Sequence, residues 1–151
     1  MKTPDPAFGP LGPHHPVLDH AVLDHVGIAV ADLHAASHPY RLLGLRPEGQ
    51  DEVLEAQGVR VRAFRTAGGL LELLAPVGTE GPIAAFLAKR GPGLHHLALR
   101  VAALEPEIAR LQAAGARFVD PEPRMGRAGS RVVFLHPKWA GGVLLELVEH
   151  D

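Results

Sequence analysis

The chain contains no cysteine, and this absence removes several kinds of chemistry at once. Disulfides, thiolate nucleophiles, and zinc or iron–sulfur sites with cysteine ligands are all excluded. Any metal ion must therefore be held by histidine, carboxylate, amide or water ligands.

A strong net charge and long apolar runs are also absent. The net charge is −2 at pH 7 with 21% charged residues, which gives no electrostatic reason to expect nucleic acid or an anionic membrane as partner. No apolar run approaches the length of a membrane span, and the start "MKTPDPAFGPLGPHHP" lacks the apolar centre of a signal peptide. We therefore expect a cytoplasmic protein with a small-molecule partner, no nucleic acid and no membrane. Its 151 residues suit one domain.

The sequence contains an internal repeat. An offset of 71 residues aligns "LDHVGIAVADL" (23–33) with "LHHLALRVAAL" (94–104), and this register continues without a gap to residue 61. Further along, the offset becomes 74, so that "GGLLELLAP" (68–76) meets "GGVLLELVE" (141–149). The three extra residues fit a hairpin turn, where insertions cost little. Each half thus supplies one histidine near its first strand and one glutamate in its last.

Each half is predicted to fold as a strand, a helix and three further strands. Asp32 is a plausible helix N-cap, Gly44 and Gly115 are plausible helix ends, and Pro39 predicts a bent or late-starting first helix. The expected strands are 23–30, 52–56, 59–66, 70–74, 94–101, 118–119, 131–135 and 143–148, with a linking helix over 82–89. The domain plan is a mobile arm (1–20) and a single domain (21–151). That domain divides into module one (21–76), a linker (77–92) and module two (93–151).

Side-chain alternation along the first strand of each half distinguishes the histidines that face a cavity from the one that does not. His25 shares a face with small residues, while Val26, Ile28 and Val30 share the face that a helix would cover. By the same parity His96 points toward a cavity, and its neighbour His95 lies with the leucines or at their edge. His25 and His96 are therefore the candidate ligands, with His95 at a strand end or behind the site.

Two glutamates stand in leucine-rich strands, Glu72 in "LLELL" and Glu146 in "LLELV". A buried, unpaired carboxylate is costly, and a cation would remove that cost. For either glutamate taken singly, we favour the simpler interpretation that it is the exposed residue of a half-buried strand. Because both recur with a histidine in a duplicated unit, we favour a metal site made of His25, Glu72, His96 and Glu146. One divalent ion, Co, Mn, Ni, Mg or Zn, suits such ligands.

The stretches "LDHVGIAVADL", "GLLELLAP", "GLHHLALRV" and "GSRVVFLHPKWAGGVLLELVE" resemble the vicinal oxygen chelate superfamily, and within it most closely the methylmalonyl-CoA epimerases. The resemblance covers residues 23–149. It implies an α+β fold, in which two tandem βαβββ modules form a U-shaped eight-stranded mixed sheet around a divalent metal. The implied ligands are the same four residues, and the implied assembly is a homodimer.

The implied reaction is epimerisation of methylmalonyl-CoA, an acyl-CoA, through an enolate that the metal stabilises. Glu146 is the first candidate acid/base, a role it would share with metal binding. The second candidate is Glu72, with Glu52 or Glu55 as alternatives. Some members of the family carry a glutamate on the strand after "QGV", where this chain has Val61.

Several basic and polar residues are candidates for substrate binding. Lys138 in "HPK", Arg131 and Ser130 are assigned to the substrate carboxylate or the coenzyme A phosphates, with Arg124 and Arg127 nearby. For each arginine alone, we favour the interpretation that it belongs to a solvated basic loop.

Other functions fit the same residues. A lactoylglutathione lyase like glyoxalase I would bind its substrate at the same coordination positions of the metal, those that the protein leaves free. An extradiol-type dioxygenase would also use them, but it would need iron and usually only three protein ligands. A non-catalytic binding protein of the same fold is the alternative from another class.

Overall fold

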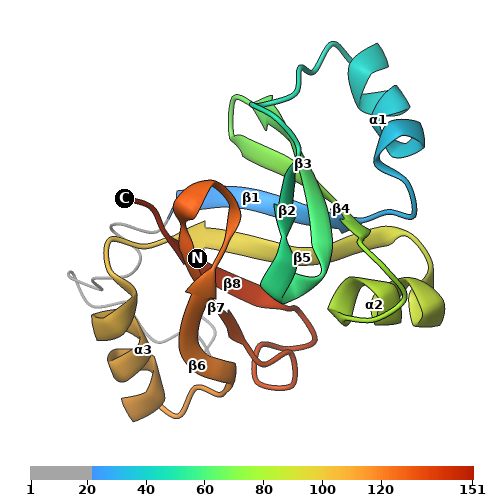
Figure 1. The fold of residues 1–151 in the computed structure, drawn as a ribbon. Coiled ribbons are helices and arrows are strands. Elements are labelled where there is room, and N and C mark those ends of the chain that lie inside the picture. The colour runs from blue at the N-terminus through green and yellow to red at the C-terminus, as the bar shows by residue number, and fades with distance from the viewer. Residues whose placement is uncertain (1–21) are drawn as a thin grey trace, which may run out of the picture.

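The structure is a computed structural model that describes residues 22–151, so the predicted arm over 1–20 lies outside the described residues. It contains eight strands and three α-helices (Figure 1). The strands are β1 (Val22–Ala29), β2 (Glu52–Leu54), β3 (Val59–Thr66), β4 (Gly69–Pro76), β5 (Gly93–Arg100), β6 (Phe118–Met125), β7 (Arg131–Leu135) and β8 (Leu145–Glu149). The helices are α1 (Leu33–Leu42), α2 (Pro82–Arg90) and α3 (Leu104–Ala113).

All eight strands belong to one curled sheet with the order β2-β3-β4-β1-β5-β8-β7-β6. The two halves of the chain meet where β1 pairs antiparallel with β5. On either side of this pair the arrangement repeats, because β1 pairs parallel with β4 and β5 pairs parallel with β8. The predicted α+β fold of two βαβββ modules around a mixed sheet is confirmed.

The first helix begins where the sequence predicts. The carboxylate of Asp32 accepts a hydrogen bond of 2.7 Å from the amide of Ala35, and α1 starts at the next residue, Leu33. Pro39 lies inside this helix without delaying its start. Gly44, with a φ of 87°, follows the helix in the left-handed conformation that glycine adopts readily.

The strand β6 is longer than predicted. It runs through Pro121 and Pro123, two residues that lack the amide hydrogen a central strand needs. Because β6 is at the edge of the sheet, these prolines leave no neighbouring strand without a partner, and register shifts against β7 absorb the irregularity. The glycines and prolines around this segment interrupt the alternation of apolar and polar residues. The sequence pattern therefore predicts only its first two residues as a strand.

Apolar side chains on the outer faces of the sheet pack beneath the helices. Val30 packs with Leu33 of α1, and Val101 with Leu104 of α3, as the parity of the strands predicts. Val26 departs from that expectation, because it lines a cavity of about 520 Å³ beside α2 instead of packing under α1. Among residues 22–151, the helices are all too short or too polar to cross a membrane.

Candidate active site and metal centre

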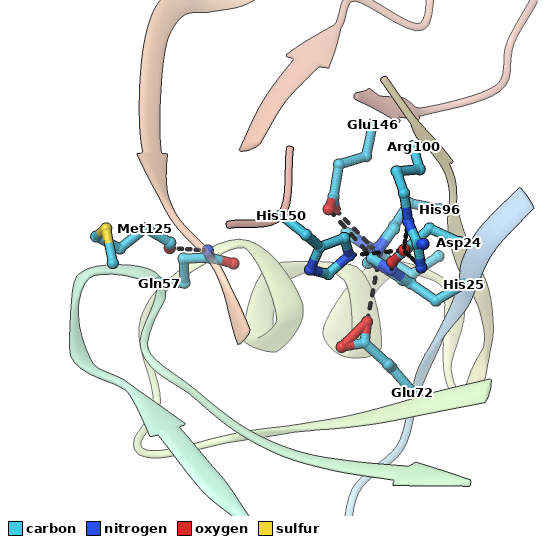
Figure 2. Close-up of polar contacts among 10 residues, drawn as sticks. Asp24, His25, Gln57, Glu72, His96, Arg100, Met125, Glu146 and His150 are labelled. Atoms are coloured by element: carbon cyan, nitrogen blue, oxygen red, sulfur yellow. Dashed lines mark hydrogen bonds and ion pairs between the residues drawn. The ribbon is translucent and has the colours of Figure 1, made fainter. Parts of the chain in front are cut away.

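Four adjacent central strands each contribute one side chain to the concave face of the sheet. In the order β4, β1, β5 and β8, these are Glu72, His25, His96 and Glu146. Their exposed fractions are 5%, 6%, 9% and 4%, so all four polar groups are buried. Figure 2 shows the two carboxylates on opposite sides of the two imidazoles.

The four side chains converge on the Nε2 atom of His25. This atom lies 2.8 Å from Oε2 of Glu72, 3.5 Å from Oε1 of Glu146 and 3.0 Å from Nε2 of His96. His96 Nε2 in turn lies 3.2 Å from Oε2 of Glu146. The ligand atoms of His25, His96 and Glu146 all lie within 4.8 Å of one another, while Glu72 approaches from the side of His25.

The separations among the ligand atoms of His25, His96 and Glu146 fit a single small divalent cation. Two ligand atoms that bind one ion at about 2.1 Å and at a right angle are about 3.0 Å apart. The separation of the two Nε2 atoms, 3.0 Å, has this value. A set of two imidazoles and two carboxylates suits the first-row divalent ions and magnesium, and it leaves coordination positions for substrate oxygens.

A glycine makes room for one of the histidines. Gly27 of β1 lies opposite His96 in the pairing with β5. A Cβ atom at this position would be 2.1 Å from Cε1 of the His96 ring, far inside van der Waals contact. The His96 imidazole can therefore occupy this position only because residue 27 has no side chain.

Asp24 is a site residue that the sequence analysis missed. Strict alternation would place Asp24 and His25 on opposite faces, but the pairing of β1 with β5 shifts its register between Leu23 and His25. Asp24 is buried, and its Oδ2 atom lies 2.7 Å from Nδ1 of His25. The one feature of the sequence that indicates a role for Asp24 is its position directly before His25. Side-chain alternation along the strand predicts the opposite face for it.

Burial and neighbouring charges change the acidity of this cluster. Burial alone would lower the pKa of His25, but hydrogen bonds with Asp24, Glu146 and Glu72 outweigh it and raise this pKa to about 12. Burial raises the pKa of the Glu146 carboxyl. Burial also lowers the pKa of His96, helped by the charges of His25 and His95. The neighbours of His25 therefore favour its protonated form when no cation is bound.

His95 lies behind His96 and outside the ligand cluster. Its Nδ1 atom lies 2.9 Å from Nδ1 of His96, and its ring packs edge-on against Phe86 of α2. Together with Leu97 it lines the cavity beside α2. The sequence prediction placed His95 with the leucines or behind the site, and the structure places it in both positions.

The cavity that contains the four site residues is small, about 40 Å³. Two residues of its lining, Gln57 and Arg127, form hydrogen bonds that join the two modules. Gln57 Nε2 donates to the carbonyl of Met125 at 3.0 Å, as Figure 2 shows, and Arg127 donates to the carbonyl of Glu48 at 2.8 Å. The amide of Ala128 donates to Glu52 Oε2 at 2.9 Å. We call these three hydrogen bonds the clasp.

The residues predicted to bind substrate are not all brought together. Ser130 is 3% exposed and lines the cavity. Arg131, the next residue, points away and forms ion pairs with Glu105 of α3 and Glu149 of β8. Lys138 lies in the loop before β8, where its amide donates to His136 Nδ1.

The predicted alternatives for the second acid/base, Glu52 and Glu55, lie outside the lining of the cavity. Glu52 is held in the clasp by the amide of Ala128. Val61 does line the cavity and brings no ionisable group to it. Glu72 and Glu146 are therefore the glutamates at this site within residues 22–151.

Comparisons with known proteins show the family of this chain. The family model described as the glyoxalase/bleomycin resistance protein/dioxygenase superfamily matches residues 24–134, well over half of the chain. The chain belongs to this superfamily. Its relatives include the ethylmalonyl-CoA/methylmalonyl-CoA epimerase of Cereibacter sphaeroides, 40% identical over 127 residues that cover 83% of this chain and 95% of the relative.

Solved structures of the superfamily give the same result. The crystal structure of methylmalonyl-CoA epimerase from Mycobacterium tuberculosis has a TM-score of 0.81 and 45% identity, and covers 86% of this chain and 88% of its own. A methylmalonyl-CoA epimerase in complex with methylmalonyl-CoA and NH4+ also has a TM-score of 0.81, with 38% identity and coverage of 87% and 96%. The superfamily member described here is thus an enzyme, an isomerase of the epimerase type.

Proposed function

We propose that the enzyme epimerises methylmalonyl-CoA at C2 and that a divalent cation held by His25, Glu72, His96 and Glu146 assists the reaction. The observation that carries this proposal is the placement of two buried carboxylates on opposite sides of two imidazoles in one cavity. The relatives named as methylmalonyl-CoA epimerases support the choice of substrate.

The chemistry needs a proton to leave one face of C2 and another to arrive on the opposite face. Loss of the C2 proton leaves an enolate whose charge is shared with the thioester oxygen. A divalent cation, when bound, supplies positive charge that favours this enolate. An acid/base group on each side of the reacting carbon then completes the inversion.

Glu146 and Glu72 are suited to these two roles. They come from β8 and β4, the outer strands of the four that form the site, so they approach a bound substrate from opposite directions. Burial raises the pKa of the Glu146 carboxyl, which makes it a stronger base for the C2 proton. We assign Glu146 to one face and Glu72 to the other.

We assign binding of the acyl-CoA to two further residues, one in the lining of this cavity and one outside it. We assign the Ser130 hydroxyl, which is buried in the cavity wall, to a polar group of the acyl portion. Lys138, on the loop before β8, is assigned to the anionic coenzyme A portion. A homodimer and a cytoplasmic location stay predictions from the sequence.

The proposal is tested by measuring the conversion of one C2 epimer into the other by chiral chromatography. Glu146→Gln keeps the shape of the side chain and removes its basicity, and we expect turnover to fall by about 10² or more. The matched control is Glu149→Gln on the same strand, because Glu149 pairs with Arg131 and the amide of Leu104 instead of facing the cavity. Equal activity in both variants would contradict the assignment of Glu146.

A further inference from the structure

Each candidate ligand histidine is preceded by a residue that holds its other ring nitrogen. In the first module, His25 directs Nε2 toward the site, and Nδ1 lies 2.7 Å from Oδ2 of Asp24. In the second, His96 directs Nε2 toward the site, and Nδ1 lies 2.9 Å from Nδ1 of His95. The internal repeat with an offset of 71 residues aligns Asp24 with His95, so the two contacts occupy equivalent places.

The Asp24 carboxylate is fixed in orientation. Its second oxygen, Oδ1, accepts hydrogen bonds from Nε of Arg100 at 3.1 Å and Nη2 of Arg100 at 3.0 Å, and it lies 2.7 Å from Nε2 of His150 (Figure 2). With both oxygens engaged and only 5% of the residue exposed, Asp24 cannot turn away from His25. The His25 ring is held by the same contact.

The contact on His96 has a different chemistry. The His95 ring is packed edge-on against Phe86, with ring centroids 5.1 Å apart, so its orientation is set by α2 and not by an ion pair. For His96 to present the lone pair of Nε2 to a cation, its Nδ1 must carry the hydrogen, and His95 Nδ1 is then the acceptor. The partner of His96 is therefore a neutral imidazole, whereas the partner of His25 is an anion.

We propose that Asp24 and His95 are the positioning residues of the metal centre, and that Asp24, through its charge, makes His25 the more strongly bound ligand of the two. A carboxylate that accepts from a ligand histidine fixes its tautomer and increases its basicity. An imidazole acceptor fixes the tautomer alone. The pseudo-twofold site is thus unequal in binding strength although its ligand types repeat. This inference rests on the proposed metal dependence.

The test is the dissociation constant for Co²⁺, measured by competition with a chromophoric chelator at fixed pH on protein that circular dichroism shows to be folded. Asp24→Asn keeps the size of the side chain and removes its charge, and we expect affinity to fall by about 10-fold to 100-fold. His95→Leu removes the acceptor on His96 and should weaken binding by a smaller factor. His95→Asn retains an acceptor atom near the position of Nδ1 and should restore most of the affinity.

The matched control is Asp51→Asn, because Asp51 forms its ion pair with Arg62 and does not line the cavity. Wild-type binding by this control combined with weakened binding by Asp24→Asn would support the proposal. Binding within twofold of wild type in both Asp24→Asn and His95→Leu would overturn it while leaving the proposed function intact. Failure of the wild-type protein to bind Co²⁺ would overturn the metal dependence and this inference together.

Discussion

The Nε2 atoms of His25 and His96 lie 3.0 Å apart, although the residues are 71 positions apart in the chain. Their strands, β1 and β5, are the pair through which the two halves of the sheet meet. Neither half alone contains the site, because each contributes one histidine and one glutamate. The position of the chemistry is therefore a direct result of joining two similar modules at their first strands.

Gly27 should be essential for the position of His96. A methyl group at residue 27 would be 2.1 Å from the His96 ring, so Gly27→Ala must move that ring away from His25. We expect metal affinity to fall at least tenfold, as measured by the same competition assay. The control is Gly68→Ala, because a Cβ at Gly68 would have nothing within 4 Å. Similar affinities for the two variants would contradict this role.

Metal binding should release a proton. In the metal-free protein the pKa of His25 is raised to about 12, so at about pH 8 this residue is protonated, and it must lose that proton to become a ligand. Because the free site holds the proton, affinity should increase as the pH rises. Titration calorimetry in two buffers of different ionisation enthalpy checks this, with about one proton released per ion expected. Identical heats in the two buffers would argue against it.

The clasp should have to open before substrate enters. The cavity of about 40 Å³ has room for a few water molecules and not for a malonyl thioester. Because the native chain has no cysteine, Gln57→Cys and Met125→Cys can be combined and joined by a short reagent with two thiol-reactive groups, such as a bis-maleimide. We expect the crosslinked protein to lose most of its turnover and each single variant, treated identically, to keep it. Full turnover after complete crosslinking would rule out opening at this point.

Two neighbouring residues should differ in their effect on substrate binding. Ser130 lines the cavity, whereas Arg131 is engaged by Glu105 and Glu149 on the side of α3. Ser130→Ala should raise KM for the acyl-CoA severalfold, and Arg131→Met should leave KM within twofold while lowering Tm slightly. Steady-state kinetics and a thermal melt of both variants make the comparison. A large rise in KM for Arg131→Met would contradict this expectation and would indicate that Arg131 binds the substrate.

Much of the fold is predictable because the repeat and the strand alternation are local properties of the sequence. The repeat pairs His25 with His96 and Glu72 with Glu146, and the alternation turns both histidines toward the cavity. The N-cap at Asp32 is equally local, since it depends on a side chain and an amide three residues away.

The remaining features depend on contacts that the sequence pattern does not contain. Asp24 enters the cavity because a register shift in the pairing with β5 overrides alternation. Arg131 is drawn away from it by Glu105 and Glu149, which lie on other elements. Predicting either side chain requires the register of strands that are distant in the chain.

Deuterium incorporation is the most direct measurement of proton transfer at C2 of methylmalonyl-CoA. Metal-loaded protein is incubated with methylmalonyl-CoA in D2O, and deuterium at C2 is followed by mass spectrometry with and without a chelator, and in His96→Ala. We predict rapid exchange in the loaded wild-type protein that is lost on chelation and in the variant. Exchange no faster than the buffer control, with the metal site full, would contradict the proposed reaction.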